Sequence, residues 1–170
     1  MNRYLFFFII VLFIGCDKTE DNIFTQTPDE RLKATADEYR EALFSAPNGW
    51  FLAVDTKKDG AYRLWMSFEE NERVGMLSDM DATFSKAGET SVVPCISSWR
   101  LKALLAPSLI FDTYSYLHIL ADPQGANNGG SNSEGLISDF EFRIVDTDNG
   151  GINLIGNYNG RLARMDRATP

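Results

Sequence analysis

The sequence predicts a mainly β domain of the α+β class, with one helix near its N-terminal end. After a helix signal at Thr27, short apolar segments recur along the chain and are separated by turn residues. Several of these segments alternate apolar and polar residues, which is the period of a strand buried on one face. Such strands form an antiparallel meander, a sandwich or a partly closed barrel, and we expect the helix to pack on that sheet.

The first segment of the chain resembles a bacterial lipoprotein signal peptide. A short positive start is followed by an apolar run from Tyr4 to Ile14, which is too short to span a bilayer as a helix. Gly15 and Cys16 then end the run in the manner of a lipobox. We expect residues 1–15 to be removed and Cys16 to carry a diacylglyceryl group and further acyl chains such as palmitate. The alternative is an ordinary signal peptide, or an anchor, with a cysteine there by chance.

Residues 16–26 are polar and acidic without apolar periodicity, so they predict a flexible tether behind the lipid. Two or three acyl chains suffice for stable membrane anchoring. An acidic run directly after the lipidated cysteine also resembles the surface-export signal of Bacteroidota lipoproteins. The remaining residues, 27–170, are expected to form a single β-rich domain.

A capping box opens the predicted helix. Thr27 can cap the first turn, Pro28 suits the first helical position, and Glu30 can bond back to the cap. An apolar stripe with helical spacing follows, made of Leu32, Ala36, Tyr39 and Leu43. The run Ala46-Pro47-Asn48-Gly49 ends it, so we expect a helix over residues 28–45.

Strands are predicted wherever a short apolar or alternating segment lies between turn signals. They are expected at 50–54, 61–68, 73–77, 92–96, 99–101, 109–111, 136–145, 152–155 and 161–165. In the second strand, Tyr62, Leu64, Met66 and Phe68 share one face. In the segment 136–145, Phe140, Phe142 and Ile144 should face inward, and Asp139, Glu141 and Arg143 outward.

Two stretches lack a clear period. The segment 114–121 is apolar throughout, and we expect a short helix there, with a strand as the alternative. Residues 121–135 are rich in Gly and Asn and predict a long polar loop, which is typical of either a functional loop or a disordered connector. A polar loop is also expected at 79–90.

Composition narrows the function classes. The chain has 16 Lys and Arg against 24 Asp and Glu, a net charge of −8 at pH 7, so its surface repels nucleic-acid phosphates. Apolar residues make up 44%, which is enough for a packed core. Two cysteines and one histidine are too few for a disulfide framework or a Cys/His zinc cluster. We therefore expect no nucleic-acid partner, no metal and no cofactor.

Several blocks together resemble one family, the Bacteroidota lipoproteins grouped as domain of unknown function 4302. The matching blocks are 42–50, 100–102, the run FDTYSYLH with ADP at 111–123, Gly135 with SDFEF at 138–142, and GN with NG at 156–160. The resemblance implies an outer-membrane lipoprotein encoded near TonB-dependent receptors and their lipoprotein partners, with no known reaction. Members are generally longer, so this chain would be a short or a truncated one.

The residues with catalytic potential do not form a recognisable motif. His118 is the sole histidine and a general base in principle, with Ser115 three positions and Asp112 six positions before it. No GxSxG elbow accompanies them, so a packed histidine is the simpler interpretation. Cys95 follows Pro94 in an apolar segment, where nothing local would lower its pKa, and we expect a buried structural thiol.

Two acidic segments of the sequence resemble a calcium site and a catalytic pair, but each also has a simpler structural interpretation. Asp146-Thr147-Asp148 begins like a calcium loop, but Gly150 and Asn157 stand where ligands are needed, so a hairpin turn is expected. Asp139 and Glu141 resemble the carboxylate pair of a glycosidase, yet their strand face also carries Arg143 and fits a solvated charge stripe.

The function expected is therefore a non-enzymatic accessory or binding lipoprotein of outer-membrane nutrient uptake, lipid-anchored at the outer membrane and exposed at the cell surface. Its expected partners are the membrane through Cys16 and a TonB-dependent receptor or neighbouring uptake lipoproteins. The alternatives are an extracellular hydrolase of glycan or peptide, and a structural or adhesion lipoprotein. The candidate binding residues lie mostly in the polar loop. They are Asp122, Asn127, Asn128, Glu134 and the exposed aromatic Trp65.

Overall fold

The structure is a computed structural model that describes residues 26–80, 94–103 and 106–170. The expected signal peptide, Cys16 and almost all of the expected tether lie outside the described residues. Most of the expected loop at 79–90 also lies outside them. In the described part of the chain, no helix is long and apolar enough to cross a membrane.

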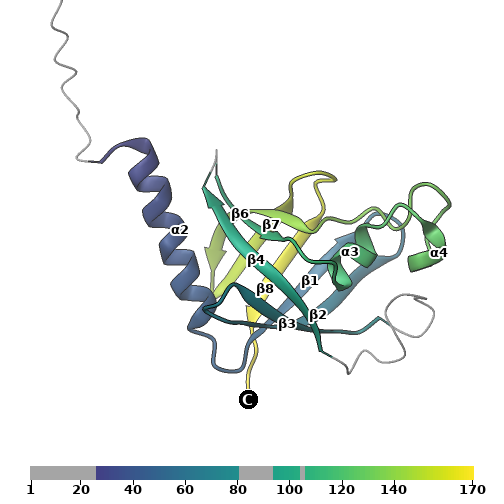
Figure 1. The fold of residues 1–170 in the computed structure, drawn as a ribbon, viewed down its shortest axis with the longest axis horizontal. Helices are drawn as coiled ribbons and strands as arrows, with labels where there is room; N and C mark the ends of the chain where they lie inside the picture. The colour runs from purple at the N-terminus through teal and green to yellow at the C-terminus, as the bar shows by residue number, and fades with distance from the viewer. Residues whose placement is uncertain (1–25, 81–93, 104–105) are drawn as a thin grey trace, which may run out of the picture.

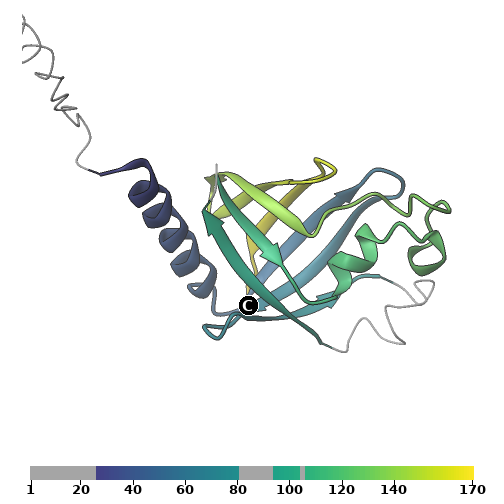
Figure 2. The same ribbon diagram turned by 45° about the horizontal axis from the view of Figure 1, so that its top comes forward.

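The sheet is a closed antiparallel barrel of eight strands, each paired with the next in sequence. The strands are β1 (Trp50–Thr56), β2 (Gly60–Phe68), β3 (Arg73–Ser78), β4 (Cys95–Ala103), β5 (Pro107–Phe111), β6 (Glu141–Asp148), β7 (Gly151–Gly156) and β8 (Leu162–Arg167). β8 pairs back onto β1, with Leu52 opposite Met165, and this pairing closes the cylinder seen in Figures 1 and 2. The mainly β, antiparallel prediction is confirmed, and a barrel replaces the sandwich alternative.

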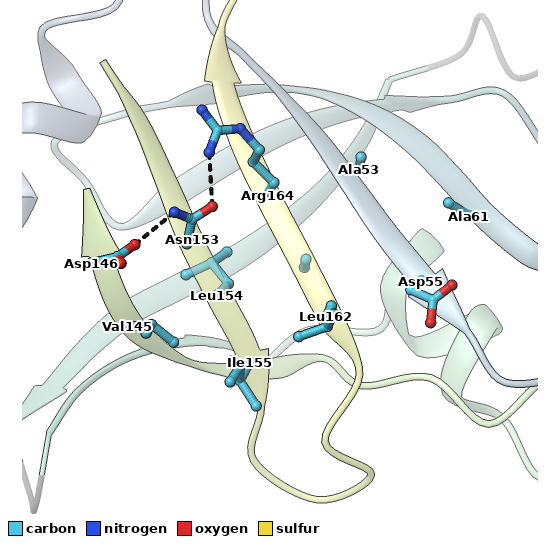
Figure 3. A pocket seen from close by; sticks show the side chains of 11 residues that line it. Ala53, Asp55, Ala61, Val145, Asp146, Asn153, Leu154, Ile155, Leu162 and Arg164 are labelled. Carbon is cyan, nitrogen blue, oxygen red and sulfur yellow. Dashed lines mark hydrogen bonds between the residues drawn. The ribbon is translucent and has the colours of Figure 1, made fainter. Parts of the chain in front are cut away.

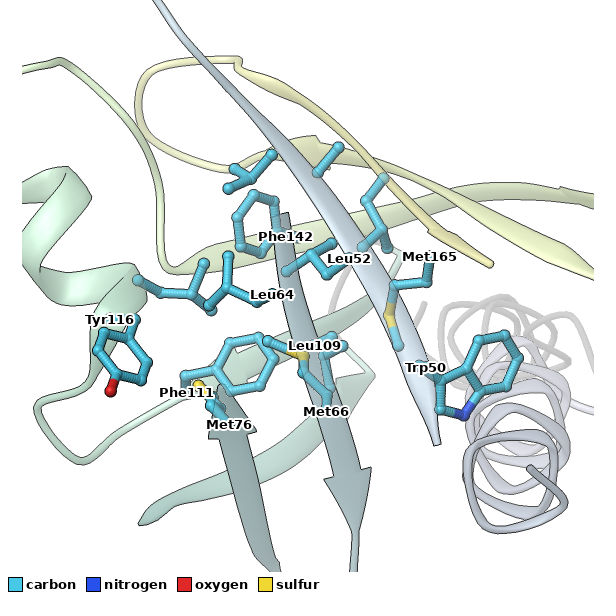
Figure 4. Close-up of a cluster of buried hydrophobic side chains, with 14 of the residues drawn as sticks. Trp50, Leu52, Leu64, Met66, Met76, Leu109, Phe111, Tyr116, Phe142 and Met165 are labelled. Carbon is cyan, nitrogen blue, oxygen red and sulfur yellow. The ribbon is translucent and has the colours of Figure 1, made fainter. Parts of the chain in front are cut away.

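Inward-facing side chains fill the lumen of the barrel (Figure 4). Alternate residues of neighbouring strands point inward, as the predicted face of β2 illustrates with Leu64 and Met66. The largest side chains with almost no solvent exposure include Trp50, Trp99, Phe111, Phe142, Leu52, Leu64, Met66, Met76 and Leu109. A barrel of eight strands is just wide enough for its own side chains or for one small ligand. In the described part of the chain, hydrophobic side chains occupy that space.

Helices lie at the two ends of the barrel (Figure 2). Helix α2 (Pro28–Phe44) begins with a capping box between Thr27 and Glu30, and its C-terminal end meets the barrel while its N-terminal half extends away. Helices α3 (Tyr116–Ala121) and α4 (Gly125–Asn128) lie at the other end. The short helix expected at 114–121 is therefore present.

Four sequence predictions need correction. The segments 92–96 and 99–101 contribute to a single strand, β4, because its alternation runs through Ser97 and Ser98. Residues 136–140 lie outside β6, and Ile137 has a φ of 59°, which no strand residue adopts. Asp139 does not face solvent but is 2% exposed. Phe142 and Ile144 do face inward, whereas Phe140 is half-buried.

The β6–β7 connection is a tight hairpin. Asn149 and Gly150 at its tip both have positive φ, 44° and 81°. Two consecutive residues of positive φ are typical of the type I′ turn, which matches the twist of an antiparallel pair. Asp148 pairs directly with Gly151. The hairpin interpretation of this calcium-like segment is thus confirmed.

Candidate functional site

Two hollows are the candidate sites. The end pocket, of about 630 Å³, lies between the α3–α4 segment and the turn that joins β7 to β8. It is lined by residues 137–141 and 157–159, with Ala121, Pro123 and Glu134 at its edge. The wall groove, of about 510 Å³, lies on the outer face of β1, β6, β7 and β8. Both volumes fall within the range of small-molecule sites.

The buried side chain of Asp139 fixes the backbone on one side of the end pocket. Its Oδ1 accepts hydrogen bonds from the backbone N–H groups of Tyr158 at 3.0 Å and Asn159 at 2.7 Å. Its Oδ2 accepts a third bond from the Arg161 N–H at 3.1 Å. One buried carboxylate thus pairs three amide donors of the β7–β8 turn, which holds that turn rigidly against residues 137–141.

Gly156 makes room for this carboxylate. A Cβ atom added at Gly156 would stand 1.9 Å from Oδ2 of Asp139, which is an impossible contact. The glycine at this position is therefore required by the close approach of the Asp139 side chain. Asn159 closes the same junction, because its Nδ2 donates to the Ser138 carbonyl at 2.6 Å.

Unpaired groups face the rim of the end pocket. Tyr158 is 93% exposed although its backbone is clamped by Asp139. The half-buried Glu141 forms no side-chain hydrogen bond or ion pair with another described residue, and neither does the exposed Asn157. The pocket therefore combines an aromatic ring, a carboxylate and an amide, all available to a ligand.

Residues just before β6 form the opposite edge of the end pocket, and backbone hydrogen bonds from Lys57 hold them in place. The Lys57 N–H donates to the carbonyls of both Leu136 and Ile137, at 3.1 and 3.3 Å. These bonds fix Ile137 in its strained left-handed conformation, which is rare for a β-branched residue and occurs where the surrounding structure over-determines the backbone. Glu134 forms an ion pair with Lys58 at 2.9 Å, and this contact lowers the pKa of the Glu134 carboxyl.

The five predicted binding residues do not form one cluster. Glu134 lines the end pocket. Asp122 accepts hydrogen bonds from the Gln124 N–H, just before α4, and from Asn127 Nδ2 at 2.7 Å. Asn128 Nδ2 donates to the carbonyls of Ile119 and Asp122. The loop is thus folded around its own polar side chains, and these three stabilise it rather than face the pocket.

Trp65, the fifth candidate, is far from this loop in the fold. It lies on the outward face of β2, and its Nε1 donates to the Asn48 carbonyl at 2.8 Å. With Phe51 and Leu77 it lines another hollow on the outer wall, of about 660 Å³. Gly49 lies directly against the Trp65 indole, at a φ of 81°.

The polar side chains of the wall groove pair with one another (Figure 3). Asn153 donates to Asp146 at 2.6 Å and accepts from Arg164 at 2.8 Å. Arg164 also pairs with Asp148 and Asp166, and its contact with Asp148 lowers the pKa of that carboxyl. Since these partners satisfy each other, the groove offers a ligand less polar chemistry than the end pocket does.

His118 is packed within the fold near the α3 end of the barrel. Its ring stacks between Phe140, with centroids 4.3 Å apart, and Tyr114 at 5.6 Å. Its Nδ1 lies 3.1 Å from the hydroxyl of Ser115, and burial lowers the pKa of His118, which favours the neutral form of the ring. Ser115 is only 1% exposed. A substrate therefore cannot reach this serine in the structure described here, and Asp112 pairs instead with Arg100 at 2.8 Å.

Cys95 is half-buried at the start of β4. Its thiol contacts the Tyr114 carbonyl at 4.0 Å, and desolvation raises the pKa of the thiol. A raised pKa keeps the sulfur protonated and weakly nucleophilic at neutral pH. Among the described residues, no group of three or more His, Cys, Asp or Glu side chains is placed to hold a metal ion.

A protein-family comparison matches residues 20–170 to the model described as Domain of unknown function (DUF4302). The chain belongs to this family. No curated protein and no solved structure matches it. Several blocks on which the sequence resemblance rested lie around the end pocket of this DUF4302 chain: Ser138–Phe142 forms one side, and the turn at 156–160 forms another.

The sequence signals for the pocket were present but ambiguous. Tyr158 and Asn157 belong to a turn motif that indicates a hairpin and nothing more. Glu141 was singled out as half of a carboxylate pair, and the structure separates the two roles. Asp139 is occupied by backbone amides, whereas Glu141 lines the pocket without a partner among the described residues.

Proposed function

We propose that this chain is a lipid-anchored binding protein of the cell envelope and a non-enzymatic accessory of nutrient uptake at the outer membrane. One observation carries the binding role: the end pocket has a rigid frame and presents Glu141, Asn157 and Tyr158 without partners. Preorganised pockets with a few convergent polar groups are typical of small-molecule sites. The wall groove has polar side chains that pair with one another, so the end pocket is the preferred site.

A binding array tests this role. The full chain, purified in mild detergent and labelled, is applied to immobilised glycans, peptides and polyamines. We expect at least one class to bind with a dissociation constant in the micromolar range or below, near −8 kcal/mol. Absence of binding to every class would contradict the proposal and favour the structural or adhesion alternative.

The hydrolase alternative gains little from the geometry. A glycosidase needs two carboxyl groups that are free to act on the substrate. Asp139 is bound by three backbone amides, so its carboxylate is not free to act with Glu141 as a catalytic pair. Turnover of an array ligand that is lost in Glu141→Gln would nevertheless favour a hydrolase.

We also propose that the protein is anchored at the membrane through Cys16 and exposed at the cell surface beside uptake receptors. Cys16 and the acidic residues behind it support this proposal. Replacing Cys16 by serine removes the acylated sulfur, so we expect the variant to leave the membrane fraction for the soluble envelope fraction. Cell fractionation followed by immunoblotting measures this. Cys95→Ser is the matched control and should remain with the membrane; a Cys16→Ser chain as firmly bound as wild type would contradict the anchor.

We further propose that α2 serves as the spacer between this tether and the barrel. Support comes from contacts at its C-terminal end. The Trp50 indole donates to the Leu43 carbonyl at 2.9 Å, and Phe44 contacts the Trp99 ring edge-on at 5.7 Å. Arg167 donates to the Ser45 carbonyl at 2.9 Å. The end pocket lies at the α3–α4 end, so an anchor attached through α2 leaves it open to solvent (Figure 1).

A further inference from the structure

We propose that the end pocket binds a neutral saccharide, with Tyr158 as the stacking platform and Glu141 as the hydroxyl acceptor. This inference rests on the proposed binding function and names its ligand class. It is drawn from three features of the pocket: an exposed ring on a held backbone, a mixed set of hydrogen-bonding groups, and a charge distribution that disfavours ions.

The Tyr158 ring stands on a backbone that is held in place. The side chain is 93% exposed, so packing does not account for it. Its backbone is held by Asp139, and the next residue, Asn159, is held at both its N–H and its side chain. A tyrosine side chain has only two rotatable bonds, so on a held backbone it loses little entropy on binding. The C–H groups on the face of a pyranose carry partial positive charge and pack against the negative face of such a ring.

The polar groups beside the ring suit hydroxyls. A sugar hydroxyl both donates and accepts, so it needs acceptors and donors together. The Glu141 carboxylate accepts only, and bonds to an ionised acceptor are about twice as strong as neutral ones. The Asn157 amide supplies donors as well as an acceptor. Both side chains line the pocket and have no partner among the described residues.

The charges around the pocket disfavour ionic ligands. An anion would meet the unpaired carboxylate of Glu141 on a chain of net charge −8. Two of the basic groups nearby are already engaged, whereas Lys57 and Arg143 form no ion pair with another described residue. Lys58 pairs with Glu134 at 2.9 Å, and Arg161 pairs with Asp55 at 3.6 Å. A cation would gain only one solvent-accessible ion pair with Glu141, an interaction that contributes little. A neutral polyhydroxylated ligand can contact Tyr158, Glu141 and Asn157 together, and it neither repels the Glu141 carboxylate nor depends on a weak ion pair.

The test titrates the full chain in mild detergent with malto-, xylo-, manno- and chito-oligosaccharides by isothermal calorimetry. Spermidine and a hexalysine peptide serve as cationic probes, and inositol hexakisphosphate as the anionic probe. We expect one of the oligosaccharide series to bind. Tyr158→Ala should weaken that binding at least tenfold and Glu141→Gln at least fivefold, whereas Tyr158→Phe, which keeps the ring, should stay within threefold of wild type.

Phe51→Ala is the control, because Phe51 is a half-exposed aromatic on the outer wall, away from the pocket, and binding should remain within twofold. Thermal midpoints check folding, and the high exposure of Tyr158 means that its removal should not shift them. Saccharide binding that is unchanged in Tyr158→Ala and Glu141→Gln would overturn the assignment to this pocket. Binding of a charged probe instead, lost in Tyr158→Ala, would overturn the saccharide class but keep the binding function. Binding of no probe would overturn both.

Discussion

Replacing Asp139 by alanine is expected to lower the free energy of unfolding by about 3–5 kcal/mol. The carboxylate is 2% exposed and accepts from the N–H groups of Tyr158, Asn159 and Arg161. A hydrogen bond to a charged group contributes roughly 1.5–3 kcal/mol, and the three bonds are not additive because they share one acceptor group. Alanine leaves the donors of the β7–β8 turn without their partner, so the turn should also become mobile.

Chemical denaturation measures the loss, and amide exchange at residues 158–161 localises it. Asp139→Asn is the matched variant: it keeps the shape but turns one acceptor into a donor, so we expect roughly 2 kcal/mol. Gly156→Ala places a Cβ against Oδ2 of Asp139 and should cost about 1–3 kcal/mol by overpacking. In the Asp139→Ala background that cost should shrink. Strictly additive losses would show that the two residues do not act on each other.

Local pattern predicted most strands because each is encoded within a few residues. The alternation in 61–68 and the apolar run at 50–54 correspond to β2 and β1. The pairing of β1 with β8 joins Leu52 to Met165 across more than a hundred positions, and no local period encodes such a contact. Closure of the barrel therefore emerged only from the structure.

The orientation of Asp139 could not be predicted from local pattern for a related reason. Extending the β6 alternation backward placed it on the solvent face, but the strand begins at Glu141 and the chain before it turns at Ile137. Its partners are amides about twenty positions later, which sequence spacing does not connect. A buried acceptor with three donors is a tertiary feature.

The candidate loop shows the same limit. Asn and Gly at 121–135 indicated exposed polar groups, yet Asn127 and Asn128 are 8% and 2% exposed. They satisfy backbone carbonyls and Asp122 within the loop itself, because a compact loop has to pair its own polar groups. The composition correctly predicts a polar loop, but the expectation that its asparagine side chains face solvent is wrong. Of the predicted binding residues in this loop, only Glu134 lines the pocket, and the unpaired groups there come from β6 and the β7–β8 turn.

Replacing Trp99 by alanine is expected to cost about 3–5 kcal/mol of unfolding free energy, the range for a large buried aromatic. Trp99 is 1% exposed and faces the barrel end covered by α2. Phe68 packs edge-on against it at 5.1 Å and Phe44 of α2 at 5.7 Å, and its Nε1 donates to the Arg73 carbonyl. The substitution opens a cavity between the helix and the lumen, so barrel and α2 should loosen together.

Denaturation of the Trp99→Ala protein gives the loss, and amide exchange at Leu43 and Phe44 should accelerate with it. Trp99→Phe retains a ring against both neighbours and should cost no more than about 1.5 kcal/mol. Phe51→Ala removes an aromatic that is 49% exposed on the outer wall, so we expect a cost below about 1 kcal/mol. If Trp99→Ala and Phe51→Ala destabilised equally, Trp99 would not lie at the junction of helix and core. If the loss were large but exchange in α2 stayed unchanged, the helix would not depend on the barrel end for its stability.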